Sequence, residues 1–493
     1  MKKIGVFLLL LVLLTGCVSN KKTAYIKPDY TQNQIVESEI TRLEALFVKE
    51  PLYVLWQSSI MKTNNSENGL INEFYELNQK KVYELLESSV SKSNWKDALA
   101  YSTSLESLNS SFYKDDLHRN IQEQYLLKAQ EDAFLKNQVQ SVPAFIQGTV
   151  TVWVDQGVKV EGGRGYADRV IGSGFFIHKD GYIITNHHVI ANMVDPKYEG
   201  YARLYIKLSS DTETRIPAKV ISWDPSLDLA LLKAEIDVPY VFTLGSSSDL
   251  EVGDSIFAIG SPLGLESTIT SGIVSSFDRK VLSTVAVMQI DAAINSGNSG
   301  GPLIDKQGGV QGVVFASIQS YEGLNFAIPV EYVKMQLPRM FQGGEITHSW
   351  IGGYGRTKKT AENKNIGVEV LYTMAGGILD IAGIQNNDII TSISGISIET
   401  VEQLQNVLVS TTPKTIIPLT YIRNNENQTV SLYLDIRPEN PGYEMYLREP
   451  EYKFFLPAFG LDLTPASSKD KKQFYVSHVI KGSTADESGF SVN

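Results

Sequence analysis

Residues 291–303 read DAAINSGNSGGPL, a run in which Ser299 lies within a glycine-rich turn. A serine hydroxyl is a poor nucleophile near neutral pH and needs a base within hydrogen-bond reach. Glycines allow the tight turn that points backbone N–H groups at a developing oxyanion. The run therefore predicts Ser299 as a nucleophile, with an oxyanion hole at Gly297, Asn298 and Ser299 in which the amides of Gly297 and Ser299 are the donors.

Two upstream segments contain the other groups that a nucleophilic serine requires. Residues 185–189 read TNHHV and include His188, and residues 224–232 read DPSLDLALL and include Asp228. A histidine can act as general base because its pKa lies near the working pH. A buried carboxylate holds the histidine ring in the right tautomer and stabilises the imidazolium. The three segments together predict a catalytic triad of His188, Asp228 and Ser299.

Each segment alone has a plainer interpretation, as a glycine turn, a core or surface histidine, or a capping aspartate. The sequence around Ser299 also fits the G-x-S-x-G pattern of esterases with the α/β-hydrolase fold. That fold needs a helix directly after the serine, with the acid and the histidine downstream. Here Gly300, Gly301 and Pro302 follow the serine and both partners lie upstream, which disfavours an esterase.

Alternating apolar residues indicate an all-β region around these segments. Residues 149–154, TVTVWV, begin it, and short strands separated by turns continue to about Pro329. This cadence is typical of barrel-like β domains. Four glycines in residues 157–165 predict a loop, and residues 330–340 predict a helix that closes the region.

Taken in order, these motifs resemble the HtrA/DegP family of trypsin-like serine endoproteases. The resemblance rests on T-N-x-H-V around His188, D-L-A-L-L at Asp228, G-N-S-G-G-P-L at Ser299, GSG at 172–174, IGSPLG at 259–264, TSGIVS at 270–275 and NFAIP at 325–329. It implies a multidomain chain with a chymotrypsin-like double β-barrel protease domain at 142–345, followed by PDZ domains of the α+β class.

The resemblance also implies roles for residues near the triad. It places Ile294 in the specificity pocket, where an aliphatic wall favours small apolar side chains. Asn298 stands where digestive trypsin-like enzymes carry an aspartate, which implies control by ordering of the loops 155–168 and 315–324 rather than by zymogen cleavage. Neighbours on a strand point to opposite faces, so only one histidine of the pair can face the nucleophile. The family pattern selects His188 and leaves His187 without a role.

Two units with the character of PDZ domains are expected after the protease. Residues 346–440 are interpreted as one domain with a helix at 400–409, and residues 450–493 as a partial second copy. The spacing G-x₃-D-x₂-G occurs at 376–383 and again at 482–489. The second copy stops where the first continues into a strand, so we expect its sheet to be incomplete in this sequence.

A glycine-containing segment opens the first of these units. In PDZ domains a peptide C-terminus adds a strand beside such a loop, and backbone amides hold its carboxylate. The resemblance therefore implies that Ile351, Gly352, Gly353 and Tyr354 bind peptide C-termini. A simple glycine turn at a domain border is the alternative.

The N-terminus resembles a bacterial lipoprotein signal, which we place at residues 1–16. A basic start and an apolar run at 4–14, too short to span a bilayer, precede Cys17, the only cysteine. We expect Cys17 to carry lipid. The lipid would anchor the chain in the cell envelope, facing the periplasm from the outer membrane or on the extracytoplasmic face of the membrane. An ordinary secretory signal is the alternative.

The segment between the anchor and the protease shows a different pattern. Residues 17–32 are polar and are interpreted as a tether. Residues 33–141 carry apolar residues at helical spacing, which predicts an all-α domain. It resembles a TPR hairpin weakly, and a helical spacer or docking module is the interpretation that we favour.

The composition of the chain argues against some classes of binding partner. A net charge of −11 argues against nucleic acid, because phosphate contacts need basic patches. The chain has no H-E-x-x-H and no thiol cluster, so neither a metal nor a cofactor is expected. The resemblance implies an endopeptidase that cleaves unfolded or damaged proteins through an acyl-enzyme, and it also implies trimers or larger assemblies. A holdase with weak cleavage and a structural lipoprotein remain as alternatives.

Overall fold

The computed structural model describes most of the chain in nine stretches. They are residues 32–127, 140–261, 268–279, 285–295, 297–317, 324–449, 451–466, 473–480 and 483–492. The expected signal, Cys17 and nearly all of the expected tether lie outside these residues. The chain divides into a unit 1–46, of which helix α1 (Gln32–Leu46) is described, and a unit 47–493. Within the described stretches, no helix is both long and apolar enough to cross a membrane.

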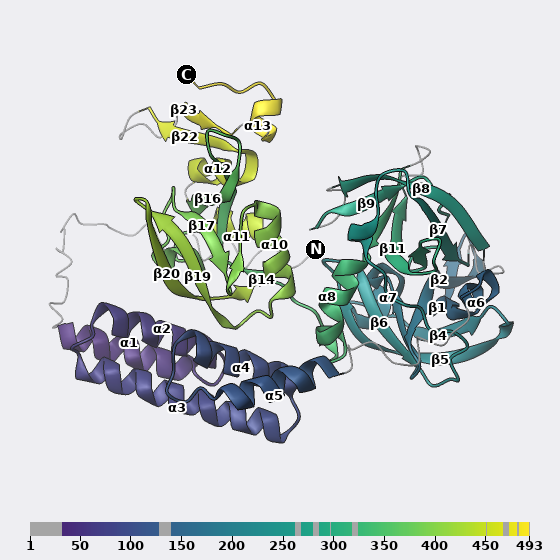
Figure 1. The fold of residues 1–493 in the computed structure, drawn as a ribbon, viewed down its shortest axis with the longest axis horizontal. Coiled ribbons are helices and arrows are strands. Elements are labelled where there is room, and N and C mark those ends of the chain that lie inside the picture. Colours follow the sequence, from purple (N-terminus) through teal and green to yellow (C-terminus); the bar gives the residue numbers. More distant parts are fainter. Residues whose placement is uncertain are drawn as a thin grey trace, which may run out of the picture. The chain divides into compact units, whose positions relative to one another are not determined.

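Four helices begin the second unit and confirm the predicted all-α region. They are α2 (Pro51–Asn64), α3 (Gly69–Ser91), α4 (Trp95–Ser107) and α5 (Asp115–Leu126), and each packs against the next (Figure 1). Local sequence sets their starts. The Asn68 side chain accepts hydrogen bonds from the N–H groups of Leu70 and Ile71, and the Asn94 side chain accepts one from Asp97 N, which satisfies donors that a helix start leaves unpaired. These four helices are called the helical segment below.

The first β-barrel follows the short helix α6 (Val142–Gly148). Its strands are β1 (Thr149–Glu161), β2 (Arg164–His178), β3 (Tyr182–Thr185), β4 (Arg203–Leu208), β5 (Asp211–Asp224) and β6 (Leu229–Ala234). They pair in the order β5-β4-β1-β2-β3-β6, and β5 also pairs with β6, so the ring closes. Side chains such as Val152, Phe176 and Ile183 are fully buried inside it.

The second barrel has six strands of its own. They are β7 (Ser255–Gly260), β8 (Thr268–Arg279), β9 (Val287–Ile290), β10 (Pro302–Ile304), β11 (Val310–Ser317) and β12 (Asn325–Pro329), closed in the order β10-β11-β12-β9-β8-β7. A 3-10 turn at Ser247–Asp249 precedes it. Helix α8 (Val330–Met340) ends the region, within the bounds that the sequence predicts. Two closed barrels in sequence are the architecture that the resemblance implies.

The predicted loop at 157–165 is wrong, because β1 and β2 continue through it as a hairpin arm. Lys159 pairs with Tyr166, and only Gly162 and Gly163 form the turn, with φ of 57° and 77°. The residues between the glycines pair across the two strands, and this pairing extends the hairpin through a segment in which the glycines alone predict a loop. The arm is exposed, with Val158 70% accessible.

The next unit, called the PDZ unit below, is a sheet with two helices. Its elements are β14 (Ser349–Trp350), β15 (Gly353–Lys359), β16 (Asn365–Thr373), α9 (Ile378–Ile381), β17 (Ile389–Ile393), β18 (Ile396–Ser397), α10 (Val401–Ser410), β19 (Ile416–Arg423), β20 (Glu426–Tyr433) and β21 (Asp435–Ile436). The main sheet runs β15-β16-β17-β19-β20, which leaves β15 at one edge. Thr400 and Gln403 form a capping box at the start of α10, close to the predicted helix start.

The last residues contain an abbreviated repeat of this unit. Helices α11 (Pro441–Arg448) and α12 (Glu451–Phe459) precede the hairpin β22 (Leu461–Pro465) and β23 (Phe474–Val479), and then helix α13 (Thr484–Glu487). The two runs with the shared spacing become α9 and α13. Each ends on a glycine with positive φ, Gly383 at 80° and Gly489 at 81°. The repeat in the sequence therefore corresponds to a repeated hairpin and helix.

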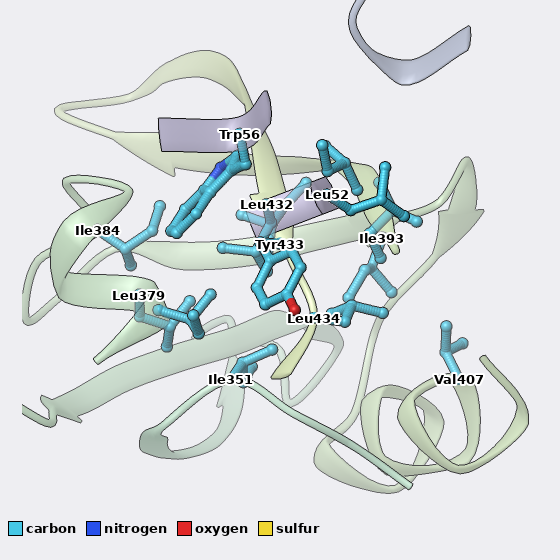
Figure 2. Close-up of a cluster of buried hydrophobic side chains, with 14 of the residues drawn as sticks. Leu52, Trp56, Ile351, Leu379, Ile384, Ile393, Val407, Leu432, Tyr433 and Leu434 are labelled. Carbon is cyan, nitrogen blue, oxygen red and sulfur yellow. The ribbon is translucent and has the colours of Figure 1, made fainter. Parts of the chain in front are cut away.

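The helical segment, for which the sequence favours a spacer or a docking module, shares a hydrophobic core with the PDZ unit. Trp56 is fully buried and stacks on Tyr433, with ring centroids 5.8 Å apart (Figure 2). The Trp56 indole N–H donates to the carbonyl of Ser431 at 2.8 Å. Lys414 of the PDZ unit pairs with Glu50 at 2.6 Å, and Ser104 Oγ accepts from the N–H of Ile416 at 2.9 Å. The two parts are thus packed and hydrogen-bonded as one body.

Replacing Trp56 by alanine tests this shared core. We expect Trp56→Ala to lower the free energy of unfolding of this part by about 3–5 kcal/mol, because a buried indole leaves a cavity and an unpaired carbonyl. Denaturation followed by circular dichroism at 222 nm measures the change. Val48→Ala is the matched control, since Val48 is 91% exposed and its loss should change stability by less than about 0.5 kcal/mol. Equal midpoints for the two variants would rule out the shared core.

Candidate active site

His188 and Asp228 form the best-defined polar pair of the site. His188 Nδ1 lies 2.7 Å from Asp228 Oδ2, and the backbone N–H of His188 donates to Asp228 Oδ1 at 2.8 Å. Because an ionised carboxylate only accepts hydrogen bonds, the proton of the neutral ring lies on Nδ1. This leaves the lone pair of Nε2 free to take a proton. The His188 side chain is 46% exposed.

The two histidines lie at the start of a helix, which corrects the interpretation that they end a strand. Strand β3 ends at Thr185, and α7 (His187–Val194) begins one residue later. Consecutive helical residues point about 100° apart, so the pair still faces different surroundings. His187 is half-buried. Burial lowers its pKa, and the nearby carboxylate of Asp228 opposes that change.

Asp228 occupies a strained turn directly before β6. Its φ is 54°, in the left-handed region that few residues other than glycine adopt, although aspartate tolerates it better than most. The side-chain N–H of Asn186 donates to the Asp228 carbonyl at 2.8 Å. The Asp224 carboxylate accepts from the N–H groups of Ser226 and Leu227, both at 3.0 Å. These bonds hold a backbone conformation that aims the carboxylate at His188.

Ser173 connects Ser299 to the first barrel. The N–H of Ser173 donates to the carbonyl of Ser299 at 2.7 Å, and Ser173 Oγ donates to the carbonyl of Gly297 at 2.6 Å. A Cβ on Gly300 would lie 2.2 Å from the Ser173 carbonyl and 3.0 Å from Asn186 N. Only glycine fits there, and the serine turn therefore lies against the residues that lead into α7.

The Ser299 hydroxyl itself has no hydrogen-bond partner among the residues that the structure describes. The structure thus brings the Ser299 backbone beside the His188 segment and pairs His188 with Asp228, while the hydrogen bond from Ser299 to His188 is not formed. A rotation of a single χ1 angle changes the direction of a serine hydroxyl. Catalytic hydrogen bonds of this kind are often long or unformed in proteins without substrate.

Two of the three residues expected in the oxyanion hole have available amides. Within the described stretches, the N–H groups of Gly297 and Ser299 have no acceptor. The N–H of Asn298 donates to Asn295 O at 3.0 Å and is not available. Gly297 has φ of 103°, which a residue with a Cβ rarely adopts. The two free amides flank the engaged one.

Ile294, expected in the specificity pocket, is half-buried and packs against the core of the second barrel. Residues 262–267 and 318–323 lie outside the described residues. The expected control loop at 315–324 therefore falls largely outside them as well, and the loop at 155–168 is the hairpin arm.

The residues expected to bind peptide C-termini lie at the free edge of the PDZ unit. Ile351 is buried, and Gly352 has φ of 69°. A Cβ on Gly353 would lie 2.5 Å from the Leu379 side chain. Tyr354 lies on β15, which pairs with β16 and with no other strand in the described part of the chain. The edge of β15 is thus available for a further strand.

Sequence reasoning missed two residues that position the site, Ser173 and Asn186. Both are fully buried polar residues beside the triad segments. A serine between two glycines is visible in the sequence, but its partners in the serine turn, Gly297 and Ser299, lie more than a hundred residues away. In the part of the chain that the structure describes, no group of histidine, cysteine, aspartate and glutamate could hold a metal ion.

Comparison with protein families matches four parts of the chain. A trypsin-like peptidase domain matches residues 172–313, which include His188, Asp228 and Ser299. A PDZ domain matches 361–434, and a TP0546 family PDZ domain matches 442–493. A domain of unknown function (DUF8517) matches 34–126. These matches and the structure confirm the predicted fold class.

Among curated proteins, the chain is 35% identical over 278 residues to a probable periplasmic serine endoprotease DegP-like of Hahella chejuensis, with 54% of this chain and 57% of the relative covered. It is 35% identical over 295 residues to a protein of the same name from Pseudomonas fulva, with 57% and 59% covered. The chain thus spans less than two thirds of these relatives' length. The solved structure of the HtrA-type protease AlgW with a tripeptide superposes with a TM-score of 0.51 at 25% identity, covering 60% of this chain and 96% of that one.

The lowered pKa of His187 predicts a pH dependence of stability. An unfolded histidine titrates near pH 6.5, and the folded one binds its proton less readily. The contribution of neutral His187 to stability is therefore complete above the pKa of the unfolded state, about pH 6.5. It is lost as the pH falls below that pKa towards the lower pKa of the folded state. We expect the stability of His187→Gln to fall less than that of the parent between pH 7 and pH 5 in urea unfolding.

The control for this experiment is His478→Gln, because His478 is exposed and lies in the last hairpin. This variant should follow the parent at both pH values. If the stability of His187→Gln changed with pH in the same way as that of the parent, burial would not lower the pKa of His187.

Proposed function

We propose that this chain, which is similar to DegP-like serine endoproteases and in which a trypsin-like peptidase match precedes PDZ matches, is an HtrA/DegP-like serine endopeptidase with Ser299 as its nucleophile. His188 is the general base and Asp228 its orienting acid. The observation that carries the proposal is the 2.7 Å contact between His188 Nδ1 and Asp228 Oδ2, made by residues that lie forty positions apart.

The proposed reaction uses each of these groups at a stated atom. Ser299 Oγ gives its proton to His188 Nε2 as it attacks the carbonyl carbon of a peptide bond. The N–H groups of Gly297 and Ser299 stabilise the oxyanion that forms. His188 then gives the proton to the leaving amine, and water hydrolyses the resulting acyl-enzyme with His188 again as base. Asp228 stays ionised and holds the imidazolium in both steps.

The proposed substrates are unfolded or damaged polypeptides. A peptide bond reaches the triad only in an extended, flexible segment, which folded proteins seldom offer. The aliphatic side chain of Ile294 favours small apolar residues before the cleaved bond. We further propose that β15 binds peptide C-termini by strand addition, supported by its free edge and by the glycines at 352 and 353.

The proposed location is the cell envelope, with a lipid on Cys17. The lipoprotein-like signal supports it, and the relatives named above are periplasmic by name. Two acyl chains would give the stable attachment that a single chain does not.

Substitution of the nucleophile tests the proposed activity. We expect Ser299→Ala to abolish both casein cleavage and labelling by a fluorophosphonate probe, and Asp228→Asn to lower kcat about 10⁴-fold. Ser248→Ala, which changes an exposed serine outside the site, should match the parent. Labelling that persists in Ser299→Ala would place the nucleophile elsewhere.

The strand-addition proposal is tested with one peptide in two forms. In the Ser299→Ala protein, which cannot cleave the ligand, a fluorescent peptide with a free C-terminal carboxylate should bind, measured by anisotropy. The same peptide with a C-terminal amide should bind at least about tenfold more weakly, because it lacks the charge that backbone amides hold. Equal binding of the two forms would contradict recognition of the C-terminus.

A further inference from the structure

The linker between α8 and the PDZ unit adds a strand to the first barrel. Strand β13 (Gly344–Glu345) runs parallel to the end of β5, pairing with Ser222 and Trp223. The N–H of Ile346 then donates to the Trp223 carbonyl at 2.8 Å. This pairing carries the linker to Asp224, the residue that begins the turn before Asp228.

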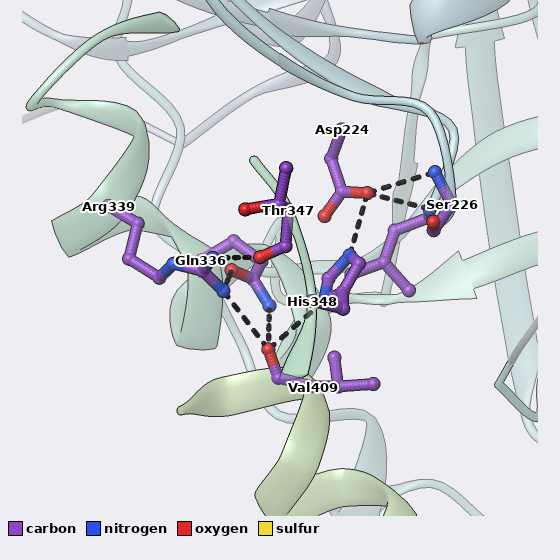
Figure 3. Close-up of polar contacts among 8 residues, drawn as sticks. Asp224, Ser226, Gln336, Arg339, Thr347, His348 and Val409 are labelled. Carbon is purple, nitrogen blue, oxygen red and sulfur yellow. Dashed lines mark hydrogen bonds and ion pairs between the residues drawn. The ribbon is translucent and has the colours of Figure 1, made fainter. Parts of the chain in front are cut away.

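His348 of this linker is buried between two acceptors (Figure 3). Its Nε2 lies 2.9 Å from Asp224 Oδ1, and its Nδ1 lies 3.2 Å from the carbonyl of Val409. The His348 and Asp224 side chains are 3% and 0% exposed. A carbonyl and an ionised carboxylate only accept hydrogen bonds, so only the imidazolium form of His348 donates to both.

The carboxylate of Asp224 depends on this histidine. Its Oδ1 also accepts hydrogen bonds from the N–H groups of Ser226 and Leu227, and its buried Oδ2 has no hydrogen-bond partner among the residues that the structure describes. A buried carboxylate is costly unless a positive charge lies close to it. Removing His348 would leave the charge at the base of the turn without its direct ionic partner.

The other side of His348 is equally fixed. The Val409 carbonyl, near the end of α10, also accepts hydrogen bonds from Gln336 Nε2 at 3.0 Å and Arg339 Nη1 at 3.2 Å. Both donors lie on α8 and are buried. The carbonyl that the imidazole contacts is therefore held by two buried donors, which limits movement of His348 away from Asp224.

We propose that His348 is a positioning residue for the catalytic pair: by pairing with Asp224 it fixes the turn that holds Asp228 against His188. The inference rests on the proposed function, and it extends the site to a residue outside the matched peptidase and PDZ segments, 172–313 and 361–434. His348 touches no reacting atom and acts through a turn of four residues and the strained backbone of Asp228.

The first test measures how fast the nucleophile reacts. The second-order rate constant of fluorophosphonate labelling depends on the activation of Ser299 and involves no peptide binding. We expect it to fall about tenfold to a hundredfold in His348→Ala, the size typical of losing an orienting partner. His348→Gln, whose amide can donate to Asp224 without a charge, should lie between His348→Ala and the parent. The KM for casein should stay unchanged in both.

The control and the folding check use the same linker. Thr347→Ala changes the residue before His348 without removing a donor to Asp224, and it should label at the parental rate. Thermal unfolding of each variant shows whether it folds. If His348→Ala does not fold, the labelling rate of His348→Gln tests the proposal instead. A folded variant with lower stability but parental labelling and kcat would reduce His348 to a structural residue and overturn the proposal.

The second test does not require enzymatic activity. In the Ser299→Ala protein, the proton on His188 Nδ1 should give a low-field proton NMR signal, because it is bonded to Asp228. We expect the signal to broaden or vanish in His348→Ala and to persist in Thr347→Ala. A signal unaffected by the loss of His348 would contradict the proposal. If the parent protein is never labelled, the proposed activity fails, while this measurement still decides the role of His348.

Discussion

The hydrogen bonds of Ser173 are the interaction on which the candidate site depends. This fully buried residue lies on β2 of the first barrel. Its N–H and hydroxyl donate to the carbonyls of Ser299 and Gly297, and its Oγ accepts from the N–H of Ser261 at 2.9 Å. Its own carbonyl accepts from Thr185 Oγ1 at 2.7 Å. One small residue thus joins the serine turn of the second barrel to the strand that leads to His188.

Other segments that are distant in the sequence also pack against one another. The helical segment completes its core with the PDZ unit through Trp56 and Tyr433. The linker after α8 pairs with β5 and inserts His348 beneath the turn of Asp228. Parts far apart in the sequence therefore contribute to one another's stability, and a change in the helical segment acts on a unit some three hundred residues later.

Much of the site could be predicted from the sequence because its chemistry is local. The glycines around Ser299 are required by a backbone with φ of 103° at Gly297 and 86° at Gly300, and such a requirement leaves a visible pattern. The alternating strands and the helix at 330–340 follow from short-range periodicity. The errors also have local causes. Four glycines predict a loop where strand pairing prevails, and the two histidines are expected at the end of a strand although a helix begins at His187.

The sequence by itself indicated which groups to propose as reactive, the order of the barrels and the presence of a repeated PDZ-like unit, since each depends on residues within a short window. Only the tertiary structure decided which groups meet. The pairing of His188 with Asp228, the bonds of Ser173 and the burial of His348 against Asp224 join residues separated by forty to more than a hundred positions. Such contacts leave no periodic signal in one sequence. They form because the closing of each sheet brings loops that are distant in the sequence to the same edge.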